Sequence, residues 1–225
     1  MANTSQVLKT ELSDVSIRKC AIADSPIVLT DIYRQDVNIA IWENQLSDDL
    51  ISSVNQLMSD TSHLNVVMTV TPDTTFENLI EHSFALEEQT ELCEYISVLV
   101  DMYCTLFELK RVGLRLTLLN RAMCPKFHVD KVPCRLVTTL SGVGTQWLPH
   151  DVVDRTKLGA GSSGLSDEES GIMRIPADIQ RLKAGDVGLI KGEGWFNNEG
   201  AGLVHRSPAL DNNQRRLLLT LDFVD

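Results

Sequence analysis

The sequence contains no cluster of lysine and arginine residues and no apolar run that could cross a membrane. Its 225 residues include 20 basic and 31 acidic side chains, which give a formal net charge of −11. Proteins that bind nucleic acids usually carry a basic surface that neutralises phosphates, so we expect no nucleic-acid partner. The longest apolar stretch, at residues 95–109, is interrupted by Asp101 and is too short for a bilayer. We therefore expect no membrane partner.

Paired cysteines and a signal peptide are missing as well. The first 16 residues lack the apolar central region of a secretory signal. The five cysteines include no C-x-x-C pair, and their odd number favours reduced thiols over a disulfide framework. These features predict a cytoplasmic protein. Cys124 and Cys134 remain open as additional metal ligands, the alternative being that they pack as apolar residues in the core.

The composition that is present is that of a globular protein, with 43% hydrophobic and 23% charged residues. A chain of this length can bury a substantial core. We expect a polar N-terminal arm at residues 1–25, a mainly helical supporting region at 26–112, and a strand-rich core at 113–225. This organisation predicts an α+β protein, most simply a single integrated domain.

Local patterns predict individual elements in the first half of the chain. Ser47–Asp60 has an N-capping serine and acidic residues in its first turn, which indicates a helix. Thr75–Arg111 has helical spacing of apolar residues, with an interruption near Glu87–Gln89. Leu64–Val70 is a β-branched run typical of a strand, and Ile27–Trp42 suggests one or two short extended segments.

After Gly113 the pattern changes to short strand-like runs separated by glycine, proline, asparagine and aspartate. Alternating short strands of this kind are typical of a barrel or jelly roll. The runs are LRLTLLN, CRLVTTL, TQWL, VGLIKG, GLVH and RLLLTLDF.

Two histidines and one aspartate in this second half have the spacing of a metal site. His128 and Asp130 are two residues apart, so on an extended segment both side chains project to the same face. His205 follows from a distant strand-like run. Two imidazoles and one carboxylate on one face of an octahedron leave three positions open, as in the facial triad of non-haem iron oxygenases. We therefore predict His128, Asp130 and His205 as metal ligands.

The order of these motifs resembles the Fe(II)/2-oxoglutarate-dependent oxygenase superfamily, whose core is a double-stranded β-helix, a jelly-roll or cupin-like fold. In that superfamily an H-x-D motif is followed by a distal histidine and then by an arginine or lysine. The resemblance implies that the triad holds Fe(II), and that Arg216 binds the far carboxylate of the cosubstrate 2-oxoglutarate. The segments CPKFHVD, GVGTQWLP and AGLVHRSP also resemble a bacterial family known as domain-of-unknown-function family 1826.

Strand parity favours Arg216 over its neighbour Arg215 as this anchor. Arg216 shares a strand face with Thr220, whose hydroxyl is a second donor to a carboxylate, whereas Arg215 shares the opposite face with leucines. Many superfamily members have serine two residues after the arginine, and this chain has Leu218 there. Arg215 is kept as the alternative anchor. Thr145 is a further candidate for the cosubstrate pocket.

Three residues near the motifs are candidates for the substrate pocket: Trp147, Trp195 and Asn197. A buried structural role for Trp147 is an equal alternative. The segment Gly159–Gly171 is rich in glycine and serine and is expected to bury little surface. It is either a lid over the site or a solvated hairpin tip.

Two functions of different class follow from these residues. In the first, the protein is an oxygenase that uses Fe(II), 2-oxoglutarate and O2 to hydroxylate a C–H bond of a small-molecule or protein substrate, with release of succinate and CO2. In the second, it is a non-enzymatic jelly-roll protein that binds a divalent metal such as zinc, which imidazole and carboxylate ligands favour over Fe(II). A cation deep in the barrel beside the metal would distinguish the oxygenase from the zinc protein.

Overall fold

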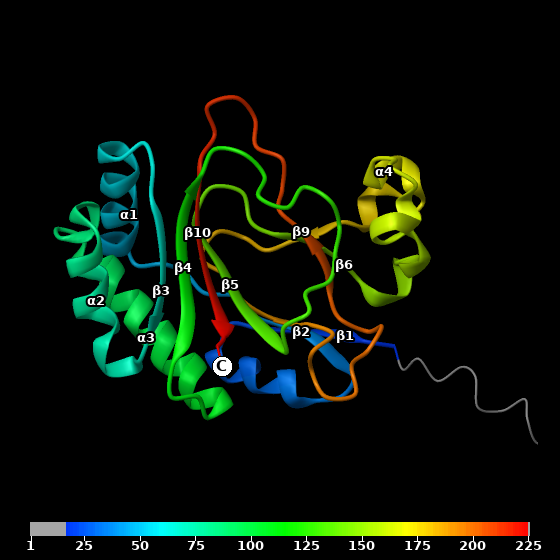
Figure 1. Ribbon diagram of the computed structural model, residues 1–225, viewed down its shortest axis with the longest axis horizontal. Coiled ribbons are helices and arrows are strands. Elements are labelled where there is room, and N and C mark those ends of the chain that lie inside the picture. Colours follow the sequence, from blue (N-terminus) through cyan, green and yellow to red (C-terminus); the bar gives the residue numbers. More distant parts are fainter. Residues whose placement is uncertain (1–16, 225) are drawn as a thin grey trace, which may run out of the picture.

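The computed structural model of the protein describes residues 17–224. Three helices cover one face of a large sheet, and a smaller sheet lies on its other face (Figure 1). The α-helices are α1 (Asp48–Asp60), α2 (Thr75–His82), α3 (Thr90–Phe107) and the short α4 (Asp167–Ser170). Turns of 3-10 helix are η1 (Pro26–Tyr33), η2 (Pro72–Thr74), η3 (Phe84–Leu86), η4 (His150–Val152), η5 (Arg155–Lys157), η6 (Gly159–Ser162) and η7 (Pro176–Asp178).

The large sheet has seven strands in the order β1-β2-β8-β5-β10-β4-β3. Every neighbouring pair is antiparallel except β1 and β2, which run parallel. The strands are β1 (Lys19–Ala23), β2 (Val37–Trp42), β3 (Asn65–Val70), β4 (Val112–Leu119), β5 (Cys134–Ser141), β8 (Val187–Lys191) and β10 (Arg216–Phe223).

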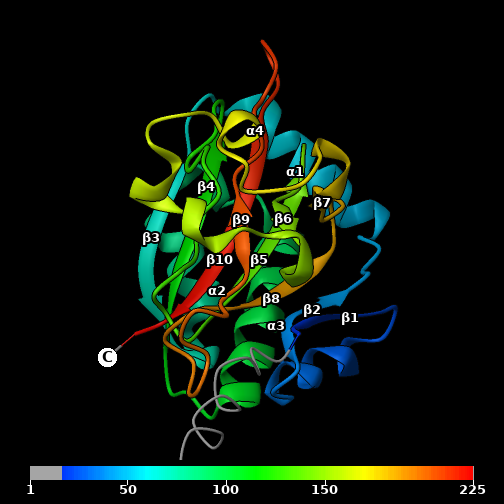
Figure 2. The same cartoon turned by 90° about the vertical axis from the view of Figure 1, so that its right-hand side faces the viewer.

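The small sheet has the order β7-β6-β9 and consists of β7 (Gln180–Arg181), β6 (Gln146–Leu148) and β9 (Val204–Arg206). Figure 2 turns this sheet toward the viewer, with β6 and β9 in front of β5 and β10. The two sheets thus face one another, and the described part of the chain is a mixed α/β structure built around one large sheet.

The buried apolar side chains form three clusters, two between the layers and one on the outside of the small sheet. The largest fills the space between the helices and the large sheet, where the helical spacing of α3 buries Leu92, Ile96 and Leu99. A second cluster lies between the two sheets and includes Ile39, Trp147 and Leu218 among its members. A third, around Phe127, Leu148 and Ile172, packs on the outer face of the small sheet. Because successive side chains of a strand point to opposite faces, each strand contributes apolar residues to the clusters on both sides of its sheet.

The sequence correctly predicted the helices α1, α2 and α3, the strand β3 at Leu64–Val70, and most strands of the second half. The helix at Ser47–Asp60 is α1, and the region Thr75–Arg111 forms α2 and α3 with a break that includes η3. The six strand-like runs after Gly113 correspond to β4, β5, β6, β8, β9 and β10.

Within residues 17–224, no helix is both long and apolar enough to cross a membrane.

The N-terminal half differs from the expectation of a mainly helical support. It adds strands to the large sheet: β2 pairs with β8, β1 pairs with the other side of β2, and β3 pairs with β4. Strand β1 falls inside the segment expected to be a polar arm, while residues 1–16 of that arm lie outside the described residues. The first part of Ile27–Trp42 is 3-10 helix η1 rather than an extended segment, since Pro26 fixes its first turn.

The segment Gly159–Gly171 is mostly exposed, as expected, but it is not the hairpin tip that was one of its two alternatives; the other alternative, a lid over the site, stays a prediction. The segment forms the short helical turns η6 and α4, and it buries Ser162, Asp167 and Ser170. Glycine and serine dominate its sequence, but the segment covers the small sheet and does not extend into solvent as a hairpin.

Substituting Ser47 with alanine is expected to destabilise the protein by about 1 kcal/mol, because Ser47 caps α1. Its side chain accepts a hydrogen bond from the backbone N–H of Leu50 at 3.2 Å. The measurement is the free energy of unfolding by urea. The exposed mid-helix Ser52, replaced by alanine, is the matched control and should change stability little or slightly raise it. Equal losses in both variants would contradict a capping role for Ser47.

Candidate metal centre

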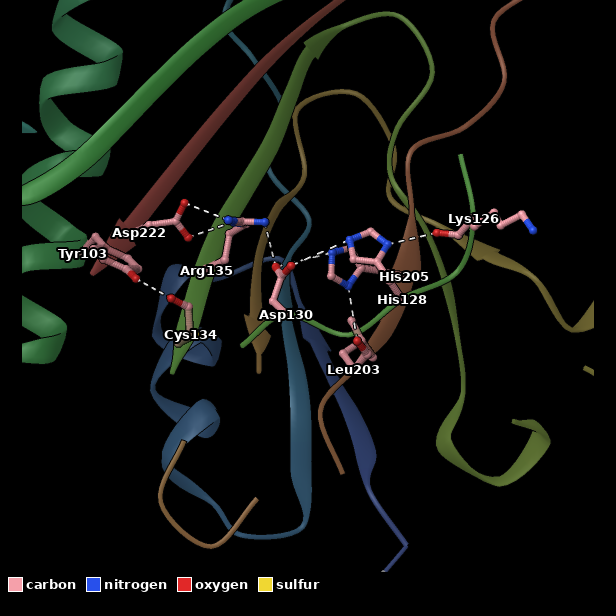
Figure 3. Close-up of polar contacts among 9 residues, drawn as sticks. All are labelled: Tyr103, Lys126, His128, Asp130, Cys134, Arg135, Leu203, His205 and Asp222. Atoms are coloured by element: carbon pink, nitrogen blue, oxygen red, sulfur yellow. Dashed lines mark hydrogen bonds and ion pairs between the residues drawn. The ribbon is translucent and has the colours of Figure 1, made fainter. Parts of the chain in front are cut away.

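The three predicted ligands lie together at the edge of the space between the sheets. His128 is in a short extended segment that precedes β5, and it forms a β-bridge with His205 of β9. Their backbones exchange two hydrogen bonds of 3.0 Å each. Asp130, two residues after His128, points to the same place, as Figure 3 shows. One ligand atom from each residue lies within 4.8 Å of the other two.

The two histidines present their Nε2 atoms toward Asp130. The Nδ1 atom of His128 lies 3.0 Å from the carbonyl oxygen of Lys126, and Nδ1 of His205 lies 3.2 Å from that of Leu203. A proton on Nδ1 satisfies each carbonyl and leaves the Nε2 lone pair free, which is the usual arrangement of metal-binding histidines. Burial lowers the pKa of His205, which favours the neutral form of this ring.

The spacing of the donor atoms fits a bound ion better than direct hydrogen bonds. Nε2 of His128 is 3.7 Å from Oδ1 of Asp130, and Nε2 of His205 is 3.5 Å from Oδ2. Both distances exceed a good hydrogen bond. Adjacent ligands at about 2.1 Å from one metal would lie roughly 3 Å apart. A small contraction of the cluster would therefore place all three donors on one divalent ion.

Asp130 is held by an arginine that the sequence reasoning missed. Nη1 of Arg135 donates to Oδ2 of Asp130 at 2.7 Å, and the same guanidinium makes a bidentate pair with Asp222 at 2.8 and 2.9 Å (Figure 3). The hydroxyl of Tyr103 on α3 donates to the carbonyl of Cys134 at 2.8 Å and fixes the start of β5 next to Arg135. Oδ1 of Asp130 receives no hydrogen bond from Arg135 and remains available to a metal.

A cavity of about 250 Å³ opens beside the three ligands. It lies between the sheets, and its walls come from β4, β5, β8 and β10 on one side and from the small sheet and its flanks on the other. Its lining residues are Arg115, Met123, Cys124, His128, Arg135, Val137, Thr145, Ile190, His205, Arg206, Ser207, Arg216, Leu218, Thr220 and Asp222.

Arg216 lies in this cavity wall and is only 1% exposed. Its guanidinium donates to the hydroxyls of Thr139 at 2.9 and 3.1 Å, Thr145 at 2.6 Å and Ser207 at 3.2 Å. Burial lowers its pKa to about 10, which still leaves it charged at neutral pH. No carboxylate within residues 17–224 forms an ion pair with it. A buried charge normally has a partner of opposite sign, so this one is prepared for an anion from outside the chain.

The two neighbouring arginines point to opposite faces of the large sheet. Arg216, Leu218 and Thr220 line the cavity, as the strand parity predicts. Arg215 instead donates to the backbone carbonyls of Met58 and Thr61 at the end of α1. It therefore lies on the helical side of the sheet, away from the cavity, which corrects its place among the candidates for cosubstrate binding.

The three candidates for a substrate pocket do not line this cavity. Trp147 packs in the apolar cluster between the sheets, which agrees with the structural alternative. Trp195 lies in the turn after β8 and packs against Tyr33 and Phe107, at 5.5 and 6.0 Å between ring centroids. Asn197 is exposed in the same turn with a φ of 55°. The segment before His205 thus folds toward α3 and η1, which corrects the placement of Trp195 and Asn197.

Neither cysteine near the motif joins the metal ligands. Cys124 is exposed and lines the cavity, and Cys134 is buried in the helix-side core, where burial raises the pKa of its thiol. Among residues 17–224, His128, Asp130 and His205 form the one cluster of three such side chains close enough to share an ion. Thr139 and Ser207 were not predicted from the sequence, although Thr139 shares a strand face with Arg135 and Ser207 follows His205 by two residues.

The profile of a family described as "Protein of unknown function (DUF1826)" matches residues 23–222. The chain belongs to the DUF1826 family. This confirms the resemblance to family 1826 predicted from the sequence. A comparison with curated proteins found no match in sequence.

Solved structures resemble this DUF1826 protein in fold. The dioxygenase for auxin oxidation 1 from Arabidopsis thaliana, in complex with 2-oxoglutarate, has a TM-score of 0.50 and 9% identity over 92% of each chain. AviO1 from Streptomyces viridochromogenes Tue57 has a TM-score of 0.47 and 17% identity, covering 90% of this chain and 96% of that one. HygX from Streptomyces hygroscopicus with iron bound has a TM-score of 0.47 and 10% identity, covering 88% and 85%.

The match to the auxin dioxygenase is a likeness of fold. It shows that the large sheet and the elements around it are arranged as in a dioxygenase whose structure contains 2-oxoglutarate. The predicted resemblance of the chain to the Fe(II)/2-oxoglutarate-dependent oxygenase superfamily is thereby confirmed at the level of fold. At so low an identity, the residues of the site have to be judged by their own geometry.

Proposed function

We propose that this DUF1826 protein is an Fe(II)- and 2-oxoglutarate-dependent dioxygenase. The observation that carries the proposal is the buried guanidinium of Arg216, which has no carboxylate partner within residues 17–224 and lies in the wall of the cavity that His128 and His205 also line. A metal-binding protein without a cosubstrate has no use for such a charge, because burying it is unfavourable. An enzyme that binds a dicarboxylate beside its metal requires it.

His128, Asp130 and His205 would hold the iron. Their donor set of two imidazoles and one carboxylate suits Fe(II), and the carbonyls of Lys126 and Leu203 keep both rings oriented. Arg135 orients the Asp130 carboxylate through its charge-assisted hydrogen bond. When bound, iron and cosubstrate supply the oxidising chemistry: O2 is consumed, 2-oxoglutarate yields succinate and CO2, and a C–H bond of the substrate is hydroxylated.

Arg216 would bind the far carboxylate of 2-oxoglutarate with its planar guanidinium. The hydroxyls of Thr139, Thr145 and Ser207 already fix the orientation of this side chain, so little conformational entropy is lost when the anion binds. The serine that many superfamily members have two residues after the arginine is Leu218 here, so these three hydroxyls provide the hydroxyl contacts of Arg216 in this chain. Thr145 and the half-buried Thr220 also line the cavity. Their hydroxyls would be a second source of hydrogen bonds to the carboxylate that Arg216 binds.

We also assign the two facing sheets to a double-stranded β-helix formed mainly by the C-terminal half. Strands β8, β5, β10 and β4 are antiparallel neighbours and face β6 and β9 across the cavity. The short segment around His128 continues the small sheet beyond β9 through its bridge to His205. In this arrangement the ligands and the arginine point inward, while a small molecule or a protein segment enters as substrate from the open side.

The test of this function is the binding and turnover of 2-oxoglutarate. Fe(II)-loaded protein, prepared without oxygen, is expected to develop a weak metal-to-ligand charge-transfer band in the visible when 2-oxoglutarate is added. In air it should release succinate, even if slowly, in the absence of a substrate. Protein without iron, and iron-loaded protein with glutarate, are the controls. If folded protein binds the metal but shows neither the band nor succinate, the zinc-binding alternative replaces the oxygenase.

A further inference from the structure

The backbone pairing between the two histidine-bearing segments is short. His128 and His205 form an isolated bridge, and the one further backbone hydrogen bond between these segments joins the N–H of Ser207 to the carbonyl of Cys124 at 2.9 Å. The segment before Asp130 has no other strand partner within residues 17–224. The positions of the two rings therefore depend on contacts outside the sheet.

Asp167 supplies such a contact to both segments. Its Oδ2 accepts a hydrogen bond from the backbone N–H of Phe127 at 2.9 Å and another from Nη1 of Arg206 at 2.8 Å. Phe127 immediately precedes His128, and Arg206 immediately follows His205. Asp167 is buried, with 6% of its surface exposed, and the hydrogen bond from Arg206 to its carboxylate is charge-assisted. One buried oxygen thus joins the neighbours of both histidines.

Other contacts hold the same arrangement in place. The guanidinium of Arg206 lies over the ring of Phe127, 4.4 Å from its centroid, and its Nε donates to Gln146 at 2.8 Å. Lys126 donates to the carbonyl of Leu165 at 3.0 Å, and Lys126 also provides the carbonyl that orients His128. The helical turns around α4 are therefore attached to the His128 segment and to β9 together.

We propose that Asp167 is a positioning residue for the metal centre, which sets metal affinity by holding His128 and His205 at ligand distance. The inference rests on the metal site of the proposed function, though not on 2-oxoglutarate binding. Without Asp167, the ion itself has to supply the free energy that brings the two segments together, and its affinity falls. Because such coupling is reciprocal, metal binding should also stabilise the segment that carries Asp167.

The experiment measures Mn(II) affinity by electron paramagnetic resonance in folded apoprotein, with the variants D167A and D167N. Changes in the residues that orient metal ligands typically weaken binding by about 10- to 100-fold, and we expect a loss of about tenfold or more in D167A. The visible spectrum of the Co(II)-loaded protein should change as well, since the ligand geometry changes. The matched control is E168Q: Glu168 pairs with the same Arg206 at 3.0 Å but is exposed, and the backbone N–H of Phe127 donates to Asp167 instead.

A second readout follows cleavage after Glu169 by a glutamate-specific protease. Saturating Mn(II) should slow this cleavage several-fold in the wild type and in E168Q, and much less in D167N, which keeps the side chain's size. Wild-type Mn(II) affinity and an unchanged Co(II) spectrum in both Asp167 variants would overturn the inference alone. Failure of the wild type to bind Mn(II) would overturn the metal centre and the inference with it. Metal binding without 2-oxoglutarate binding would overturn the oxygenase and leave Asp167 in its role.

Discussion

Replacing Arg216 with alanine is expected to weaken 2-oxoglutarate binding about thirty-fold to several-thousand-fold, which corresponds to about 2–5 kcal/mol for one partner of a buried charged pair. The guanidinium is 1% exposed and has no acid to pair with among residues 17–224, so its charge is available to the far carboxylate of the cosubstrate. Metal binding should survive, because Arg216 is not a ligand. The measurement is 2-oxoglutarate affinity in Mn(II)-loaded protein without oxygen.

Arg215 provides the matched control on the same strand. Arg215→Ala removes hydrogen bonds to the end of α1 and should lower the free energy of unfolding by roughly 1–2 kcal/mol, with little effect on 2-oxoglutarate affinity. Arg216→Lys keeps a charge but loses the planar fork and should fall between wild type and Arg216→Ala. Unchanged affinity in Arg216→Ala would leave the chain with a metal triad and no cosubstrate anchor.

The second large effect is expected at the ligands themselves. His128→Ala and His205→Ala each remove one of three donors, and binding of one divalent ion per chain should be lost at micromolar metal. The two substitutions should behave alike, because both Nε2 atoms face the same Asp130 carboxylate at similar distances. Metal content of the purified proteins after loading and desalting is the measurement.

A variant at a surface histidine serves as the control, because it shows whether removing any histidine lowers the metal content. His63 is exposed and does not belong to the cluster, so His63→Ala should retain wild-type metal content. If both ligand variants still bind one ion per chain, the metal lies elsewhere and the assignment of the triad is wrong. Thermal unfolding of the apoproteins shows whether each variant is folded before its metal content is compared.

The pairing of His128 with Asp130 and the face of Arg216 could be predicted because both depend on local spacing. The i, i+2 relation of His128 and Asp130 and the alternation along β10 are read directly from neighbouring residues. The helix α1 was predictable for the same reason, since its cap and its apolar face lie within one segment. The resemblance to a known superfamily then supplied the distant partner, His205.

Contacts between residues far apart in the chain left no such pattern. Arg135 bridges Asp130 to Asp222, and Asp167 joins Phe127 to Arg206, yet none of these pairs has a spacing that periodicity detects. The edge positions of β2 and β3 were not predictable for a related reason: Leu64–Val70 and part of Ile27–Trp42 were predicted as extended, but no local pattern shows which edge of the sheet each strand reaches. Sequence proximity also misled, as the turn that carries Trp195 runs toward α3 even though His205 follows soon after.

The sheet order has a consequence for any attempt to isolate the ligand-bearing half of the chain. The four strands from residues 112–223 that form the middle of the large sheet have β2 on one flank and β3 on the other. A fragment that began at residue 112 would leave the backbone groups of β8 and β4 unpaired along both margins. Open margins of that kind recruit strands from other molecules. Such a fragment should therefore associate with itself, so the N-terminal residues are needed to cover both margins of the strands that carry the site.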